Sequence, residues 1–192
     1  MRERFERMVF AAGFTLVEVI TALGLLTTAS VGLAHLVATA TARHLDARFH
    51  SMTMVVAAAK MEQLRGLAWG IDRATGLWIT DTATDLSTDP PSPGGRGLAA
   101  SPGGTLHANV AGYVDYLDAN GAWIGTGTAP VAGTCFIRRW AIHELPSPPS
   151  TTLVFEVMVT TLRREQSAAG RRTQGRLPDD AWIVGVKTRM VS

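Results

Sequence analysis

One apolar run near the N-terminus limits what this chain can fold into. From Phe14 to Ala42 the only formally charged residue is Glu18, over a stretch of 29 residues. About 20 apolar residues in a helix are enough to cross the hydrocarbon core of a bilayer. The run therefore predicts one membrane-spanning helix, and the rest of the 192 residues has the mixed charge of a single water-soluble domain.

The segment that precedes the run is basic. Residues 1–13 contain three arginines and two glutamates. Positive charge next to a membrane helix tends to stay on the cytoplasmic side. We therefore expect residues 1–13 in the cytoplasm and the C-terminal domain across the membrane.

A cleaved secretory signal is a competing interpretation of this region. Residues 38–40 and 40–42 both have the small-x-small pattern of a signal cleavage site. However, the apolar stretch from Phe14 to Val37 has 24 residues, longer than the about 7–15 of a signal core. It also contains Glu18, and a carboxylate inside a bilayer costs on the order of 2.5–3.5 kcal/mol. Such a residue is a functional candidate that needs a partner.

The sequence Gly13-Phe14-Thr15-Leu16-Val17-Glu18 resembles the processing site of type IV prepilins and type II secretion pseudopilins at all six positions. The resemblance implies a leader peptide, residues 1–13, that a membrane-embedded peptidase removes after Gly13. The same enzyme would methylate the new N-terminal Phe14. It also implies that Glu18 pairs with the Phe14 amine of a neighbouring subunit in a filament.

Elementary chemistry agrees with these implied roles. Gly13 has no Cβ, so its backbone can approach a peptidase closely. Glu18 lies four residues from Phe14, one helical turn away, and its charge is unmatched in an isolated membrane helix. Because removing one partner of a buried ion pair costs about 3–5 kcal/mol, the pairing would favour one docking register.

The helical pattern continues beyond the membrane segment 14–42 into a soluble half, residues 43–69. Neither Gly nor Pro occurs between Leu33 and Arg65, and a helix end is expected near Gly66 or Gly70. A helix from 14 to 67 would be about 80 Å long. The expected apolar face, at a period near 3.6, consists of Leu45, Phe49, Met52, Val56, Ala59, Gln63 and Leu67. Residues 57–65 resemble the helix end of minor pilins and pseudopilins of the V and I types.

The remaining chain divides into a loop and a sheet. Residues 70–105 are rich in Gly, Pro, Ser, Thr and Asp and are expected to form a variable loop. Residues 106–192 alternate as strands do, with a tight turn at Asn120-Gly121. The prediction is an α+β, pilin-like fold in which one long N-terminal helix packs on a C-terminal antiparallel sheet of about four strands.

Three strand faces are expected within this sheet domain. Each follows from alternation along one segment. The faces are Phe136, Trp140 and Ile142; Leu153, Phe155, Val157 and Val159; and Trp182, Val184, Val186 and Met190.

Charge and cysteine content add little evidence of function. The net charge of +2 is too small to indicate a nucleic-acid partner. The single cysteine, Cys135, cannot form an internal disulfide, and its apolar neighbours favour a buried structural thiol. Three arginine pairs are interpreted as solvated surface: Arg138–Arg139, Arg163–Arg164 and Arg171–Arg172.

The sequence contains no catalytic or cofactor-binding pattern. The histidines have no ligand spacing with Cys or Glu, and no serine lies in a nucleophile elbow. Residues 115–121 resemble part of a calcium loop, but Tyr116 and Gly127 stand where an EF-hand needs Asp and Glu. A hairpin turn is therefore the preferred interpretation. We expect no enzyme activity, no cofactor and no metal.

The combined expectation is a minor structural subunit of a type IV pilus or type II secretion pseudopilus. Its partners would be the prepilin peptidase/methyltransferase, other pilin or pseudopilin subunits, and the inner membrane, from which it would pass into a cell-surface or periplasmic filament. Two alternatives remain open. One is a periplasmic binding module on an uncleaved single-pass anchor, and the other is a secreted protein released near Ala40 or Ala42.

Overall fold

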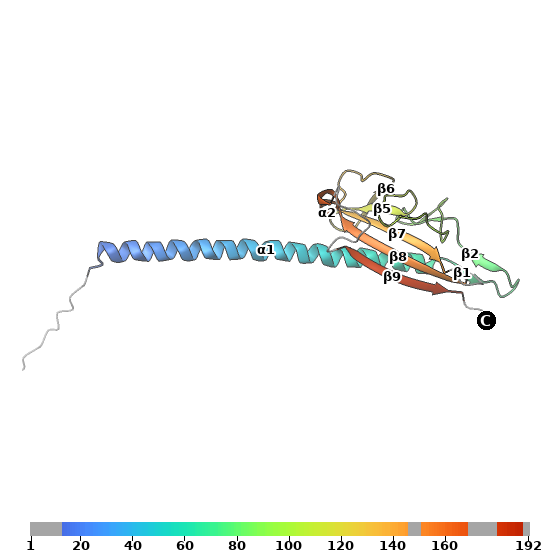
Figure 1. Cartoon of the computed structure of the whole chain (residues 1–192), viewed down its shortest axis with the longest axis horizontal. Coiled ribbons are helices and arrows are strands. Elements are labelled where there is room, and N and C mark those ends of the chain that lie inside the picture. The colour runs from blue at the N-terminus through green and yellow to red at the C-terminus, as the bar shows by residue number, and fades with distance from the viewer. Residues whose placement is uncertain (1–12, 146–150, 169–179, 190–192) are drawn as a thin grey trace, which may run out of the picture. The chain divides into compact units, whose positions relative to one another are not determined.

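A 51-residue helix, α1 (Leu16–Gly66), precedes all the strands (Figure 1). The structure, a computed structural model, describes residues 13–145, 151–168 and 180–189. It divides into two units: the first extends to Asp46, and the second comprises Ala47–Ser192. The helix ends at Gly66, one of the two positions expected from the sequence. There the amine of Lys187 donates to the carbonyls of Arg65 and Leu67. The Arg65 carbonyl is one of the last four, which helix geometry leaves without a partner.

Two small antiparallel hairpins lie in the segment that follows the helix. β1 (Trp69–Ile71) pairs with β2 (Trp78–Thr80), and β3 (Thr84–Asp85) pairs with β4 (Ser92–Pro93). An aspartate orders each hairpin turn: Asp72 accepts from Ala74 N at 2.9 Å, and Asp85 accepts from Ser87 N at 2.8 Å. Asp81, between the two hairpins, accepts from Ala83 N at 3.0 Å. The Gly- and Pro-rich segment 70–105 thus has secondary structure of its own.

The principal sheet has five antiparallel strands in the order β6-β5-β7-β8-β9. The expected α+β layout of one long helix and a C-terminal antiparallel sheet is present. The sheet has one strand more than expected because the residues after Asn120-Gly121 form a strand of their own. Its members are β5 (Val114–Leu117), β6 (Trp123–Thr126), β7 (Phe136–Glu144), β8 (Thr152–Thr161) and β9 (Ala181–Thr188). A short helix, α2 (Leu162–Ser167), follows β8.

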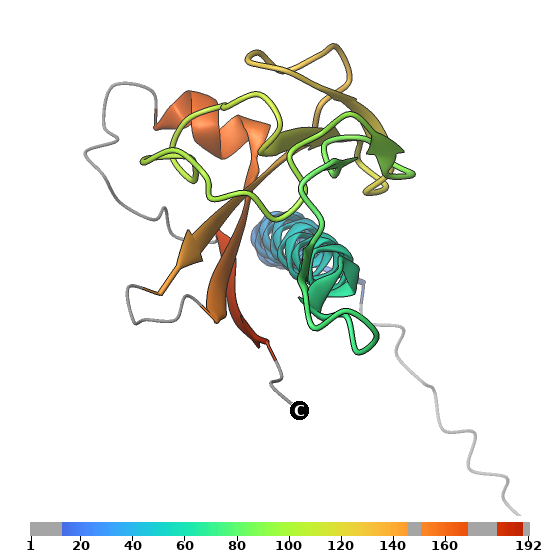
Figure 2. The same cartoon turned by 90° about the vertical axis from the view of Figure 1, so that its right-hand side faces the viewer.

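The core of the second unit lies between the sheet and the part of α1 from Ala47 onward. Figure 2 looks along this helix, with β7–β9 on one side of it and the connector of residues 69–105 on another. Two of the three predicted strand faces are buried here: Phe136, Trp140 and Ile142 on β7, and Leu153, Phe155, Val157 and Val159 on β8. Both predictions are confirmed.

The third predicted face, on β9, points to solvent. Trp182, Val184 and Val186 share one face as predicted, but all three are exposed, and Met190 lies outside the described residues. The opposite face of β9 turns toward α1, where Gly185 lies against Met61.

The predicted apolar face of the helix is offset from the buried face, although Met52 and Leu67 of the predicted set are partly buried and pack against the core. The buried residues of α1 are Thr53, Val56, Ala57, Lys60, Met61 and Leu64, so that only Val56 belongs to both sets. Ala59 is exposed, whereas Lys60, which does not belong to the predicted face, is buried. Apolar side chains surround the helix on nearly every side between Met52 and Ala59, and hydropathy alone therefore does not select the buried face.

Candidate functional site

The expected processing junction lies outside regular structure. Gly13, Phe14 and Thr15 precede the first helical residue, and all three are exposed. The Phe14 side chain is 81% exposed. A peptidase needs an extended substrate. A junction within a helix would first have to unwind, because its backbone groups are hydrogen-bonded within the helix. The peptide bond between Gly13 and Phe14 therefore needs no unfolding of α1 to become accessible.

The helix begins directly after this junction because Thr15 caps it. The Thr15 hydroxyl accepts a hydrogen bond from Glu18 N at 3.2 Å, and the Thr15 carbonyl accepts from Val19 N at 3.1 Å. Thr15 and Glu18 have the spacing of a capping box. A carboxylate in the first turn also interacts favourably with the helix dipole. Glu18 therefore serves the local start of the helix, and its side chain is exposed.

The apolar half of α1 exposes its side chains in this structure. The large hydrophobic residues from Phe14 to Val37 are exposed to between 43% and 81%. Among the described residues, α1 is the one helix long and apolar enough to cross a membrane.

Hydroxyl groups in this half are satisfied within the helix, as a lipid environment requires. Each donates to a carbonyl three or four residues before it. These donors are Thr21, Thr27, Thr28, Ser30, Thr39 and Thr41.

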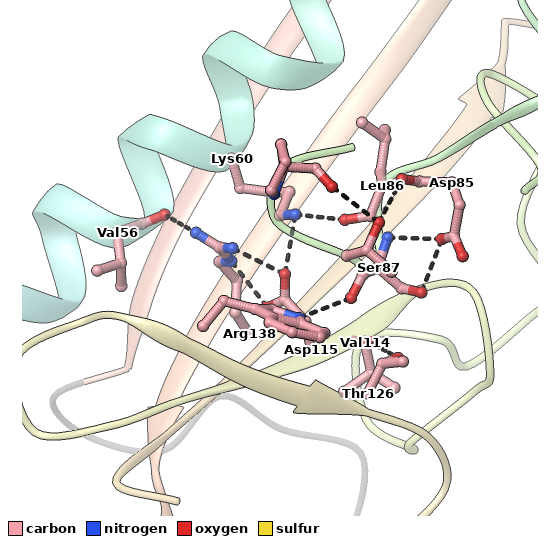
Figure 3. Close-up of polar contacts among 12 residues, drawn as sticks. Val56, Lys60, Asp85, Leu86, Ser87, Val114, Asp115, Thr126 and Arg138 are labelled. Atoms are coloured by element: carbon pink, nitrogen blue, oxygen red, sulfur yellow. Dashed lines mark hydrogen bonds and ion pairs between the residues drawn. The ribbon is translucent and has the colours of Figure 1, made fainter. Parts of the chain in front are cut away.

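A buried charge cluster joins the other half of α1 to the sheet. Figure 3 shows the Lys60 side chain of α1 directed toward Asp115 of β5, and the Val56 carbonyl of α1 facing Arg138 of β7. The Lys60 amine lies 2.9 Å from Asp115 Oδ2 and donates to the Leu86 carbonyl at 2.6 Å. Arg138 donates from Nε and Nη2 to the two Asp115 oxygens, at 2.9 and 2.7 Å. Its Nη1 donates to the Val56 carbonyl at 3.0 Å.

This cluster is buried almost completely. Lys60 and Asp115 have no exposed surface, and Arg138 is 3% exposed. Burial lowers the pKa of Lys60 to about 8, against an upward influence of Asp115 and a further downward influence of Arg138. The Trp140 ring, whose centroid is 4.5 Å from the Lys60 amine, adds a cation–π contact. The cluster fixes the register of α1 against two strands and the connector at once.

The second arginine of the pair is also buried, on the outer face of β7. Arg139 donates to Asn109 Oδ1 at 2.9 and 2.7 Å and forms an ion pair with Glu165 of α2 at 2.9 Å. The interpretation of Arg138–Arg139 as solvated surface is therefore wrong. Each guanidinium finds planar acceptors that compensate its burial. Arg163 and Arg164 are exposed, and Arg171–Arg172 lie outside the described residues.

Sequence reasoning missed Lys60, Asp115 and Arg138, although the sequence contains a signal for Asp115 and Arg138. Arg138 alternates with Phe136 and Trp140, which places it on the buried face of β7. Asp115 lies between apolar residues in a four-residue strand that is buried throughout. A cation and an anion that both fall on buried positions predict each other, since isolated buried charge is too costly.

The segment that resembles a calcium loop forms a hairpin turn, as preferred from the sequence. Asp118 Oδ1 accepts from Asn120 N at 2.8 Å and from Ala122 N at 2.9 Å. Gly121 has φ of +79°, and a Cβ there would lie 2.9 Å from Val56, so the turn requires glycine. Cys135 is half-buried and packs against the core.

The family resemblance is carried by the residues from Gly13 to Glu18 and by the long helix after them. The structure places the first of these residues at an open helix start, with an exposed apolar helix following them. Comparison of the chain with protein-family models, with curated proteins and with solved structures finds no match.

Proposed function

We propose that this chain is a minor structural subunit of a type IV pilus or type II secretion pseudopilus. A prepilin peptidase cuts it between Gly13 and Phe14 and methylates Phe14. The mature subunit is first held in the inner membrane, with its sheet domain on the side opposite the cytoplasm. It then enters a filament, in which its apolar helix packs against other subunits.

The observation that carries this proposal is where the helix begins relative to the six-residue motif. The motif supplies a cut site in open chain, at Gly13 and Phe14. It then supplies a helix cap at Thr15 and a carboxylate in the first helical turn, at Glu18. Cutting there would create a free amine one turn before Glu18, at the very start of an apolar helix. An ordinary membrane anchor needs neither the cut nor the carboxylate.

Two further features support a role in assembly. The apolar half of α1 exposes apolar side chains along its length, and the six hydroxyl groups named above donate within the helix. Such a surface suits packing in lipid or among other helices. The part of α1 from Ala47 onward is joined to the sheet by the ion pairs of the buried Lys60–Asp115–Arg138 cluster. Force applied to the helix would therefore reach the sheet domain through a fixed contact.

The decisive experiment determines the mature N-terminus by mass spectrometry, in cells with and without a prepilin peptidase. The expected result is an N-methylated Phe14 that appears only when the peptidase is present. Gly13→Val places a branched side chain at the cut site and should block processing. The matched control is Gly24→Val, which lies in open space within α1 and should leave processing intact. A chain that starts at Met1 would support the anchored binding module, and a start near Thr41 or Arg43 would indicate a secretory signal.

A further inference from the structure

The buried cluster around Lys60 holds one more positive charge than negative charge. Among the described residues, Asp115 is the only carboxylate within ion-pair distance of Lys60, and it also pairs with Arg138. Both Asp115 oxygens accept from Arg138. Two cations therefore share a single anion in a region that has almost no exposed surface.

The other charged groups near Lys60 do not enter this cluster. Asp89 is exposed and acts on Lys60 only through space. Glu62 and Arg65 pair with each other on the exposed side of α1. Lys187 binds the carbonyls at the end of α1. The buried face of β8 toward the helix is apolar. Asp85 of the connector lies beside Leu86 (Figure 3) and accepts from Ser87 N and Ser87 Oγ at 2.8 and 2.7 Å. Among the described residues, the charged groups of the elements packed around Lys60 are therefore Asp115 of β5, Arg138 of β7, Lys187 of β9, Asp85 and Asp89 of the connector, and Glu62 and Arg65 of α1.

We propose that the Lys60–Asp115–Arg138 cluster is a pH-sensitive latch. When Lys60 loses a proton, the neutral amine keeps its hydrogen bond to the Leu86 carbonyl. Asp115 and Arg138 then remain as a balanced ion pair, and the excess buried charge is gone. Proton release therefore tightens the packing of α1 on the sheet and the connector. This inference is independent of the proposed filament role.

The direction of the pH effect follows from proton linkage. The pKa of Lys60 is about 8 in the folded chain, against an ordinary value of 10.5. Between these two values the unfolded chain binds more protons than the folded chain. The free energy of unfolding must therefore rise with pH through this window. Tyr113 and Tyr116, whose pKa values burial raises, oppose this rise only above about pH 10.

The test uses the full chain in detergent micelles, with denaturant unfolding followed by tryptophan fluorescence. All five tryptophans lie in the second unit, so the signal reports the sheet domain. Raising the pH from 7.5 to 9.5 should lower the unfolding equilibrium constant by about twentyfold through Lys60. A constant that stays unchanged or increases would overturn the proposal.

Two variants separate Lys60 from other titrating groups. Lys60→Met should remove most of the pH response. Lys187→Met should keep the part due to Lys60, although burial lowers the pKa of Lys187 as well. A pH response in Lys60→Met equal to that of the unaltered chain would refute the latch.

A third variant tests whether the pH response depends on the charge of Asp115. Asp115→Asn removes the one negative charge and should lower the pKa of Lys60 further. Its stabilisation with pH should then begin at a lower pH than in the unaltered chain. An onset at the same pH would also refute the proposal.

Discussion

Gly185 of β9 lies directly against Met61 of α1. A Cβ built on Gly185 would approach Met61 Sδ to 2.6 Å, closer than any van der Waals contact allows. Met61 is itself buried, so its side chain has little room to move away. The close approach of helix and edge strand therefore depends on the absence of a side chain at this position.

Gly185→Val should destabilise the second unit by about 1–3 kcal/mol, the usual cost of overpacking a filled core. Denaturant unfolding followed by tryptophan fluorescence measures this change. Gly70→Ala is the matched control, since that strand glycine has nothing near its Cβ position, and it should change stability by less than about 0.5 kcal/mol. Equal effects of the two variants would mean that Met61 repacks freely.

Gly185 also explains the reversed orientation of β9. Alternation along the strand correctly grouped Trp182, Val184 and Val186, but an apolar face is normally assigned to the core. Here the helix takes the opposite face because only the small residue at 185 lets α1 approach. Alternation along β9 therefore predicts which residues share a face. Which of the two faces is buried depends on how closely α1 can approach each of them.

The buried charges show a second limit of sequence reading. The apolar run, the helix end at Gly66, the turn at Asn120-Gly121 and the buried faces of β7 and β8 all follow from local patterns. Arg138 and Asp115 are 23 residues apart in sequence, and Lys60 comes from a different element. The local patterns place Arg138 and Asp115 on buried positions, but they do not show that Lys60 joins them. Their burial becomes reasonable only when the strands and helix bring them together.

Asp115→Ala should be among the most damaging substitutions in the sheet domain. It leaves the cations of Lys60 and Arg138 buried without their shared anion. Removing one partner of such a group costs about 3–5 kcal/mol. Glu62→Ala is the control, because it removes only the exposed pair with Arg65 and should cost under about 0.5 kcal/mol. Thermal or denaturant unfolding of the full chain distinguishes the two, and similar small losses would show that the cluster adds no net stability.

Thr15→Val should loosen the first turn of α1. The substitution keeps the shape of the side chain but removes the oxygen that accepts from Glu18 N, a loss of about 1 kcal/mol for a typical cap. Amide hydrogen exchange in detergent micelles should show reduced protection at Glu18. Protection deep in the second unit, at β7 and β8, should not change. Thr15→Ser retains the hydroxyl and should exchange like the unaltered chain; faster exchange there would assign the effect to the lost methyl group instead.

Glu18→Gln tests whether the carboxylate matters for assembly apart from its place in the helix start. Glutamine at the third helical position can still complete a capping box, so the helix should begin at the same residue. The charge that would pair with a neighbour's Phe14 amine is lost. In cells that contain the peptidase, processing after Gly13 should continue, and the amount of chain in the sheared filament fraction should fall at least tenfold. Asp46→Asn is the control, since it removes an exposed carboxylate from the same helix outside the apolar run, and it should assemble normally. If Glu18→Gln enters filaments as well as the unaltered chain does, the carboxylate serves only the start of the helix, and the ion-pair model of docking fails even where processing at Phe14 is established.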